Sequence, residues 1–160
     1  MNVNIRTARL EDAPAIAVLA TQLGYPTSAE QAEARLRDVL NRSEGAVLVA
    51  EGEDGRAIGW THVVGAYRVE NDPFAEIAAM VVDENYRSQG IGAALVKAAI
   101  DWAGRQGFGT VRVRSNVVRE RTHAFYERLG FRRTKSQVVF VRVTPKDLKD
   151  TRDVKDQERQ

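Results

Sequence analysis

The stretch ENYRSQGIGAALVKAAIDWA, residues 84–103, decides the fold. It places Arg87 just before Gly90 and Gly92, and a long alanine-rich apolar segment follows the second glycine. Glycine in a helix costs about 1 kcal/mol relative to alanine, so two glycines at the start of a predicted helix indicate a need for bare backbone. The first N–H groups of a helix lack internal partners and lie at the positive end of its dipole, so such a loop can cradle a phosphate.

Two other phosphate-binding loops fit this stretch poorly. The P-loop ends in Gly-Lys-Ser/Thr, whereas Gly92 is followed by Ala93 and Ala94. The dinucleotide-binding fingerprint needs three glycines at the first strand-to-helix turn, whereas this loop lies in mid-chain and lacks the third glycine. On its own, a two-glycine loop is also compatible with a plain strand-to-helix turn.

Hydrophobic periodicity places the loop within a series of strands and helices. The segment AEIAAMVV, residues 75–82, leads into the loop and is apolar enough to be a central strand, buried on both faces. Early strands can form an antiparallel meander, whereas the strand–helix–strand unit around the loop must be a parallel crossover. The sequence therefore predicts a mixed sheet flanked by helices, with further strands over 2–9, 46–51, 57–69, 110–115 and 136–143, and helices over 11–23, 28–42, 91–105 and 119–129.

The length of 160 residues and the hydrophobic content of 43% suit one globular domain with a substantial core. There is no internal repeat and no linker, so we expect a single domain over residues 1–143. The remaining segment, residues 144–160, is highly charged with few apolar anchors. We expect it to be a frayed helix or a disordered tail.

Composition excludes several classes of protein and site. No apolar run approaches the ~20 residues that span a bilayer, and the first residues contain no apolar core of a secretory signal. The chain has no cysteine and two histidines, which excludes disulfides and thiolate ligands and argues against a zinc site. We expect a cytoplasmic protein without membrane attachment or bound metal, with a homodimer as the candidate assembly.

The charge is unevenly distributed along the chain. Residues 11–84 carry fourteen acidic residues and five arginines, a net charge of −9, whereas residues 105–135 carry nine basic and two acidic residues, a net charge of +7. A nucleic-acid ligand is not expected, because the acidic half would repel phosphates. The asymmetry fits one anionic and one cationic ligand, and it fits equally well two solvated faces that differ in charge.

A second motif lies near the C-terminus, where HAFYERLGF, residues 123–131, places Tyr126 four residues before Gly130. Together with MVVDENYRSQGIGAALV, residues 80–96, it resembles the two motifs of the GNAT superfamily of acetyl-CoA-dependent N-acetyltransferases. The resemblance extends to about Val143. It implies the GNAT fold, with a central mixed sheet of about six to seven strands and about four helices. The implied activity is transfer of an acetyl group from acetyl-CoA to a primary amine, by direct attack in a ternary complex.

The resemblance also implies which residues bind coenzyme A. In the family the pyrophosphate lies on the glycine loop, which corresponds here to Arg87, Ser88, Gln89, Gly90, Ile91, Gly92 and Ala93. The pantetheine arm pairs like an extra strand with backbone of the strand before the loop, which corresponds to Met80, Val81 and Val82. The family makes room for the arm with a bulge and a V-shaped gap in the sheet.

Two catalytic roles follow from the same resemblance. Tyr126 matches the general acid that protonates the departing thiolate, although a tyrosine in this position can also be a packing residue. Glu76, on the strand leading into the loop, matches the glutamate base of some members, and the segment FAEI resembles the histone-acetylating branch. Glu76 can equally be a solvent-facing edge residue. His62 is the alternative base, although a lone histidine on a strand is more often structural.

One position departs from the family pattern. Many members carry asparagine seven residues before the tyrosine, whereas this chain has Arg119 there and its nearest asparagine is Asn116. The cofactor contact of that asparagine is therefore in doubt. We expect Asn116 and Arg119 near the cofactor, with Arg119 and Arg121 as candidates for its phosphates.

The acceptor is expected to be a small amine that is cationic, because the acidic half of the chain would attract one. Tyr25 lies where the family builds one wall of the acceptor site, and Trp60 and Tyr67 are expected opposite it. Two alternatives stay open. The chain can acetylate a protein or peptide amine, or it can be a non-catalytic acyl-CoA-binding module, against which Tyr126 argues.

Overall fold

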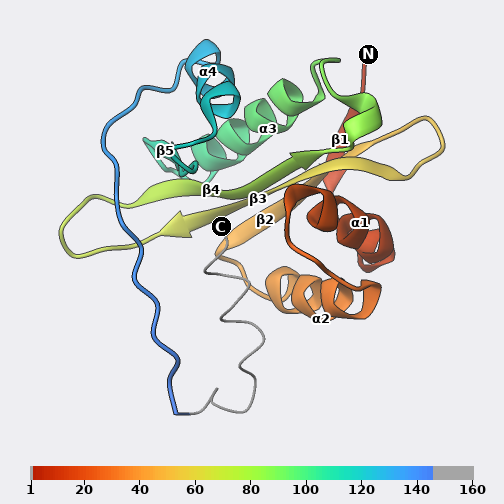
Figure 1. The fold of residues 1–160 in the computed structure, drawn as a ribbon, viewed down its shortest axis with the longest axis horizontal. Helices are drawn as coiled ribbons and strands as arrows, with labels where there is room; N and C mark the ends of the chain where they lie inside the picture. Colours follow the sequence, from red (N-terminus) through yellow and green to blue (C-terminus); the bar gives the residue numbers. More distant parts are fainter. Residues whose placement is uncertain (1, 146–160) are drawn as a thin grey trace. The chain divides into compact units, whose positions relative to one another are not determined.

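The computed structural model describes residues 2–145, and the chain divides into two compact units, Met1–Arg114 and Ser115–Gln160. The first unit contains a five-stranded sheet in the order β1-β2-β3-β4-β5 (Figure 1). Its elements are β1 (Asn4–Thr7), η1 (Leu10–Asp12), α1 (Ala13–Leu23), α2 (Ala29–Leu40), β2 (Gly45–Glu51), β3 (Ala57–Ala66), β4 (Phe74–Val82), η2 (Glu84–Tyr86), α3 (Ile91–Arg105) and β5 (Val111–Val113). The second unit contains α4 (Glu120–Arg128).

The sheet confirms the predicted mixed architecture. Strands β1 to β4 are antiparallel neighbours, and β4 and β5 are parallel and joined by the crossover helix α3. Helices α1 and α2 cover one face of the sheet and α3 covers the other (Figure 1). Leu36 of α2 and Val49 of β2 belong to the core on the first face, whereas Leu95 of α3 and Ile58 of β3 belong to the core on the second.

Local sequence signals account for the ends of the helices. The side chain of Ser28 accepts a hydrogen bond from the N–H of Gln31, and the side chain of Gln31 accepts one from the N–H of Ser28, which is the capping box that begins α2. Helix α1 ends at Gly24, whose φ of 108° is left-handed. That conformation favours glycine, which explains why the chain turns there.

An aromatic cluster fixes the end of β3 against the end of α3. The ring of Phe108 packs against Trp102 of α3 and against Tyr67, with ring centroids 6.0 Å apart in both pairs. Gly65 lies beneath it, and a Cβ atom at that position would lie 2.6 Å from Cζ of Phe108. The glycine is therefore needed because the ring occupies the space of a side chain.

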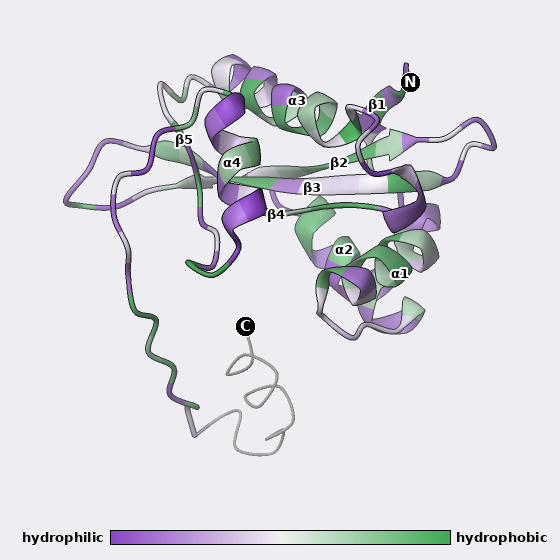
Figure 2. Cartoon of the chain, turned by 45° about the horizontal axis from the view of Figure 1, so that its top comes forward, coloured by the Kyte–Doolittle hydropathy of each residue, from purple (hydrophilic) through white to green (hydrophobic). Residues whose placement is uncertain are grey.

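The predicted strand over residues 136–143 is wrong for the described structure. Residues 131–144 form no strand, and Val138, Val139 and Phe140 are 78%, 76% and 91% exposed. Part of the segment is coloured as hydrophobic in Figure 2, but it pairs with no strand of the described residues, and β-propensity without a pairing partner does not make a strand. The sheet consequently has five strands in the described residues, rather than six to seven.

The division between Arg114 and Ser115 falls inside the expected domain over residues 1–143, which stays a prediction. Most of the expected charged tail, residues 146–160, lies outside the described residues. Within residues 2–145, no helix combines the length and the apolar character needed to cross a membrane.

Candidate functional site

The loop between η2 and α3 has an unusual backbone. Ser88 has a φ of 62° and Gly90 a φ of 82°, and Ser88 is the only non-glycine among the described residues with a positive φ. Left-handed residues in a short loop turn successive N–H groups toward one point, which makes an anion-binding concavity. Residues 87–90 are all exposed, and a Cβ atom at Gly90 would meet no atom within 4 Å. Gly90 is therefore needed for its conformation and not for space.

The start of α3 adds donors to this loop. The first hydrogen bond within the helix runs from the N–H of Ala94 to the carbonyl of Gly90, at 3.0 Å. The N–H groups of Ile91, Gly92 and Ala93 precede it and have no partner inside the helix. Because Gly90 has no side chain to cap them, these donors can serve an external anion such as a pyrophosphate.

Arg87 connects the loop to the strand before it. Its Nε donates a hydrogen bond to the carbonyl of Val82, at 3.3 Å. The guanidinium therefore lies beside the last residue of β4, between the two segments that were expected to hold coenzyme A. It brings a fixed positive charge to this end of the sheet.

Strand β4 loses its neighbour halfway along its length. Its pairing with β5 is confined to Ala75, Glu76 and Ile77, which face residues 111–113. On the other side, pairing with β3 continues to Val82. Within the described part of the chain, residues 78–82 thus lack a strand partner on the β5 side.

A bulge marks the point where the two parallel strands part. His62 of β3 pairs with Ala79 and the next residue, Val63, pairs with Ile77, so Ala78 is an extra residue in β4. Ala78 is exposed although its strand lies inside the sheet. A bulge bends and twists its strand, and an unpaired stretch of strand offers N–H and C=O groups to an incoming extended chain. This geometry fits the pantetheine arm expected beside Met80, Val81 and Val82.

Glu76 lies just before the bulge, with 12% of its side chain exposed. Arg114 donates from Nε and Nη2 to the same carboxylate oxygen, Oε1, at 2.8 and 2.6 Å. Within residues 2–145 no donor is placed on Oε2, which leaves that oxygen able to accept a hydrogen bond. Glu76 is therefore an ion-paired carboxylate and not an isolated acid in an apolar strand.

Sequence reasoning missed the arginines around Phe74 and Glu76. The guanidinium of Arg112 lies 3.9 Å from the centroid of the Phe74 ring, and that of Arg68 lies 5.6 Å from it. Residues alternate between the two faces of a strand, so the pattern TVRVRS signals that Arg112 and Arg114 share one face. The sequence alone does not show that Arg112 lies opposite Glu76 in the parallel pair of β4 and β5. This part of the site is consequently not purely acidic.

His62 and Trp60 lie on the same face of β3. Both are half-buried, and Trp60 packs against the core formed with α1 and α2. Burial lowers the pKa of His62, so its imidazole is neutral near pH 7. The indole Nε1 of Trp60 is buried without a hydrogen-bond partner among the described residues.

The structure does not group the three residues expected to line the acceptor site. Tyr25 lies in the connection between α1 and α2 and is 45% exposed. Tyr67 follows the last residue of β3 and packs on Phe108, whereas Trp60 lies near the start of that strand. Tyr25 and Trp60 are thus associated with the α1–α2 side, whereas Tyr67 belongs to the aromatic cluster with α3.

In the second unit, Tyr126 is buried within α4. Its ring packs against Phe125 and Phe131, with centroids 5.1 and 5.4 Å away. Burial raises the pKa of Tyr126 to about 12. The phenol therefore stays protonated and keeps a hydrogen to donate toward a thiolate. Its role as general acid stays a prediction.

Asn116 and Arg119 form the turn that begins α4. The carbonyl of Asn116 accepts a hydrogen bond from the N–H of Arg119 at 3.0 Å and lies 2.8 Å from Nε2 of His123. Its side-chain oxygen accepts a hydrogen bond from the N–H of Val118. Arg119 is exposed at the N-cap of the helix, and its contact with a cofactor stays a prediction.

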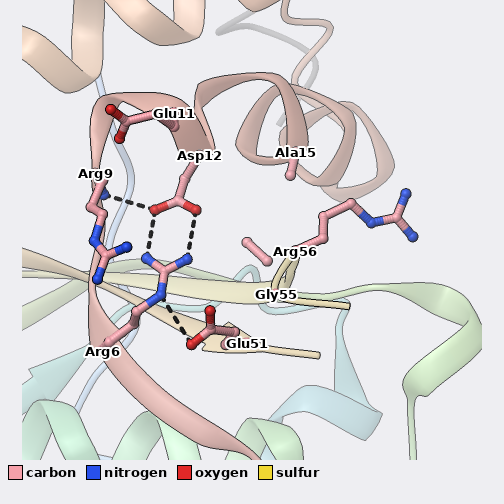
Figure 3. A pocket seen from close by; sticks show the side chains of 9 residues that line it. Arg6, Arg9, Glu11, Asp12, Ala15, Glu51, Gly55 and Arg56 are labelled. Atoms are coloured by element: carbon pink, nitrogen blue, oxygen red, sulfur yellow. Dashed lines mark hydrogen bonds and ion pairs between the residues drawn. The ribbon is translucent and has the colours of Figure 1, made fainter. Parts of the chain in front are cut away.

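A hollow of about 330 Å³ lies beside η1 and the β2–β3 hairpin, and none of the predicted site residues lines it (Figure 3). Arg6 donates two hydrogen bonds to Asp12 at its edge, at 2.8 and 2.9 Å, and lies 3.2 Å from Glu51. Burial alone would raise the pKa of Asp12, but the hydrogen bonds from Arg6 and from the N–H of Arg9, with the charge of Arg6, lower it below its ordinary value. This cluster joins β1, η1 and β2 and plays a structural part.

Comparison with known proteins gives consistent matches. Residues 10–131 match the profile of the Acetyltransferase (GNAT) family. The N-acetyltransferase YhfO of Bacillus subtilis is 30% identical over 134 residues, covering 81% of this chain and 89% of that protein. An aminoglycoside N(6')-acetyltransferase type 1 of Serratia marcescens is 28% identical and covers 79% and 88%. The solved structure of aminoglycoside N-acetyltransferase AAC(6')-Iy in complex with CoA superposes with a TM-score of 0.77 at 21% identity, covering 89% and 95%.

Proposed function

This chain belongs to the GNAT family of acetyltransferases, and we propose that it transfers an acetyl group from acetyl-CoA to a primary amine of a small, cationic acceptor, by direct attack in a ternary complex. The observation that carries the proposal is the strand β4, which is unpaired beyond Ile77 and runs into a left-handed loop at the start of α3. An extended amide chain fits the first feature and a pyrophosphate the second.

The donor site is built from backbone groups. Acetyl-CoA, when bound, supplies an activated thioester. The free edge of residues 80–82 pairs with the arm of the donor, and the loop of residues 87–90 with the first N–H groups of α3 binds its phosphates. Arg87 neutralises part of that charge, and contacts of Asn116 and Arg119 with the cofactor stay predictions.

The acceptor amine is placed on the face of the sheet that carries Glu76. The free Oε2 of Glu76 accepts a hydrogen bond from the acceptor's ammonium group, and Tyr25 and Trp60 supply apolar surface on the α1–α2 side. Relatives named aminoglycoside acetyltransferases support a small acceptor with several amines. Tyr126 keeps its proton across the working pH range and donates a hydrogen bond toward the sulfur of the donor.

A thiol-release assay with acetyl-CoA tests the proposal directly. The panel contains aminoglycosides, polyamines, amino-acid amides and lysine-containing peptides, and the product is identified by mass spectrometry. Release of thiol with a small polyamine or aminoglycoside is the expected result. Turnover confined to peptides would show a protein-amine acetyltransferase instead, and acetyl-CoA binding without turnover on any amine would show a non-catalytic module.

A further inference from the structure

We propose that His62 is the general base of this enzyme, accepting a proton from the acceptor's ammonium group while Glu76 holds that group in place. The inference rests on the proposed function and assigns the proton to a residue on β3. Glu76, on β4, is left with a binding role. The two residues come from neighbouring strands and share one face of the sheet.

The strand register places the two side chains around one site. Val64 of β3 lies directly opposite Glu76, and His62 is two residues earlier on the same strand. Residues two apart on a strand point to the same face. Diagonal neighbours across an antiparallel pair have Cα atoms about 7–8 Å apart, so their side chains can contact the same nitrogen atom from two sides.

The bulge places this pair beside the gap in the sheet. His62 is paired with Ala79, and the bulged Ala78 lies between that position and the last β4–β5 pair at Ile77. Ala78 is exposed at this point of the strand. His62 therefore stands one strand away from the start of the unpaired edge at which the donor is proposed to enter.

Chemistry favours the imidazole over the carboxylate as the proton acceptor. An imidazole that is neutral at pH 7 can accept a proton, and histidine is the side chain that most often serves as a general base. One oxygen of Glu76 is already engaged by Arg114. No hydrogen bond occupies the ring of His62 among the described residues, so its basic nitrogen is available.

The surroundings keep the imidazole neutral. Burial lowers the pKa of His62, and no neighbouring charge contributes to that shift. Its partners in the ladder are Val47 on β2 and Ala79 on β4, and α1 carries no titratable side chain. The residues that α2 turns toward the sheet core are apolar. The charged groups on the same face of the sheet are Glu76, Arg112 and Arg114 on β4 and β5, and Arg6 with its partners Asp12 and Glu51.

The proposed step is balanced within the acceptor and this side chain. One N–H bond of the ammonium breaks, and its electron pair stays on the acceptor nitrogen as the nucleophile. The proton forms a new N–H bond on a ring nitrogen of His62. The resulting imidazolium then returns the proton to water, so no further reactant is required.

The test is the pH dependence of kcat/KM for the wild-type enzyme and for His62→Gln, with an acceptor amine of ordinary pKa near 10. If His62 takes the proton from a bound ammonium, the wild-type value rises to the pKa of His62 and then stays level. Without this base only the free amine can react, so kcat/KM of His62→Gln rises continuously toward pH 10. At pH 7 we expect a loss of about 100- to 10,000-fold.

A proton NMR titration of the free protein supplies a readout without turnover. The chain has two histidines, so the imidazole signal lost in His62→Gln belongs to His62. The midpoint of this NMR titration should lie below pH 6.5, and it should equal the apparent pKa of the acid limb in the kcat/KM profile. The matched control is His123→Gln, which should keep the wild-type profile, and His62→Asn with circular dichroism checks that the fold is retained.

The outcomes separate this inference from the proposed function. An active wild-type enzyme whose pH profile is unchanged in His62→Gln would overturn the role of His62 alone. An NMR midpoint that differs from the kinetic limb would do the same. A wild-type protein that binds acetyl-CoA but acetylates no amine would overturn the proposed function, and the role of His62 with it.

Discussion

Arg114, which follows β5, donates two hydrogen bonds to a single oxygen of Glu76 on β4, at 2.6 and 2.8 Å. The pair spans the two parallel strands at the point where they part. It fixes the carboxylate while leaving its second oxygen for another donor. Under the proposed function, Arg114 competes with a cationic acceptor for the charge of Glu76, and this competition can be measured.

The first prediction concerns this ion pair. Arg114→Gln should lower the KM for a cationic amine by about tenfold, because Glu76 is then uncompensated; this equals about 1.4 kcal/mol. Glu76→Gln should raise that KM. Since the side chain of Arg114 is 65% exposed, stability to urea should change by less than about 1 kcal/mol. The control Arg105→Gln, at the end of α3, should change neither, and equal effects in both arginine variants would refute the competition.

The second prediction concerns the glycine loop. Gly90→Ala places a side chain on a residue with φ 82°, which costs roughly 1–2 kcal/mol and should shift the loop out of its left-handed conformation. Calorimetry should then show markedly weaker binding of acetyl-CoA. Gly104→Ala is the matched control, because Gly104 lies inside α3 with open space around it. That variant should bind normally, with stability raised by up to about 1 kcal/mol.

The third prediction concerns Tyr126. Tyr126→Phe should lower kcat by up to about 100-fold and leave the affinity for acetyl-CoA unchanged, because the hydroxyl acts on the reacting sulfur and not in binding. With a pKa of about 12, the phenol stays protonated below pH 11, so ionisation of Tyr126 should cause no loss of kcat between pH 8 and 10. If Tyr126→Phe keeps the wild-type rate throughout that range, Tyr126 is a packing residue.

The fourth prediction concerns the packing at Gly65. Gly65→Ala places a Cβ atom 2.6 Å from the ring of Phe108, so the aromatic cluster must shift. We expect a loss of about 1–3 kcal/mol in the free energy of unfolding. Phe108→Leu removes the ring, and in that background the same glycine substitution should cost much less. Additive effects in this double-mutant cycle would contradict the proposed contact.

The fifth prediction concerns stability in acid. The pKa of Asp12 is lower in the folded protein than its ordinary 3.8. The stabilisation is therefore complete above that value and is lost as the pH falls below it. Asp12→Asn should remove this dependence and destabilise the protein by up to about 3 kcal/mol, because Arg6 keeps its buried charge. Unfolding curves between pH 2 and 6 measure both effects, and parallel losses in the wild type and variant would exclude Asp12 as their source.

Features encoded locally could be predicted from the sequence. The capping box at Ser28 and the glycine loop at Gly90 depend on residues within a few positions of each other, and both are present. The parallel crossover followed from chain order alone. These local signals are the ones from which the candidate donor site is predicted.

Features that depend on register could not be predicted in this way. The bulge at Ala78 exists only relative to the pairing of His62 and Val63 with β4. The contact between Glu76 and Arg114 joins residues 38 positions apart. The predicted strand over 136–143 failed for the same reason, because its composition is suited to a sheet but says nothing about whether a neighbour is present.

The unpaired stretch of β4 has a consequence for how this protein can evolve. The groups it offers are main-chain N–H and C=O groups, which every residue except proline carries alike. The side chains of Met80 and Val82 meanwhile pack against the core with Ile91 and Leu95 of α3. Selection at these positions therefore acts through packing volume and not through ligand chemistry. Under the proposed function, new acceptors can be acquired by changes on the opposite face of the sheet while the edge that holds the donor remains the same.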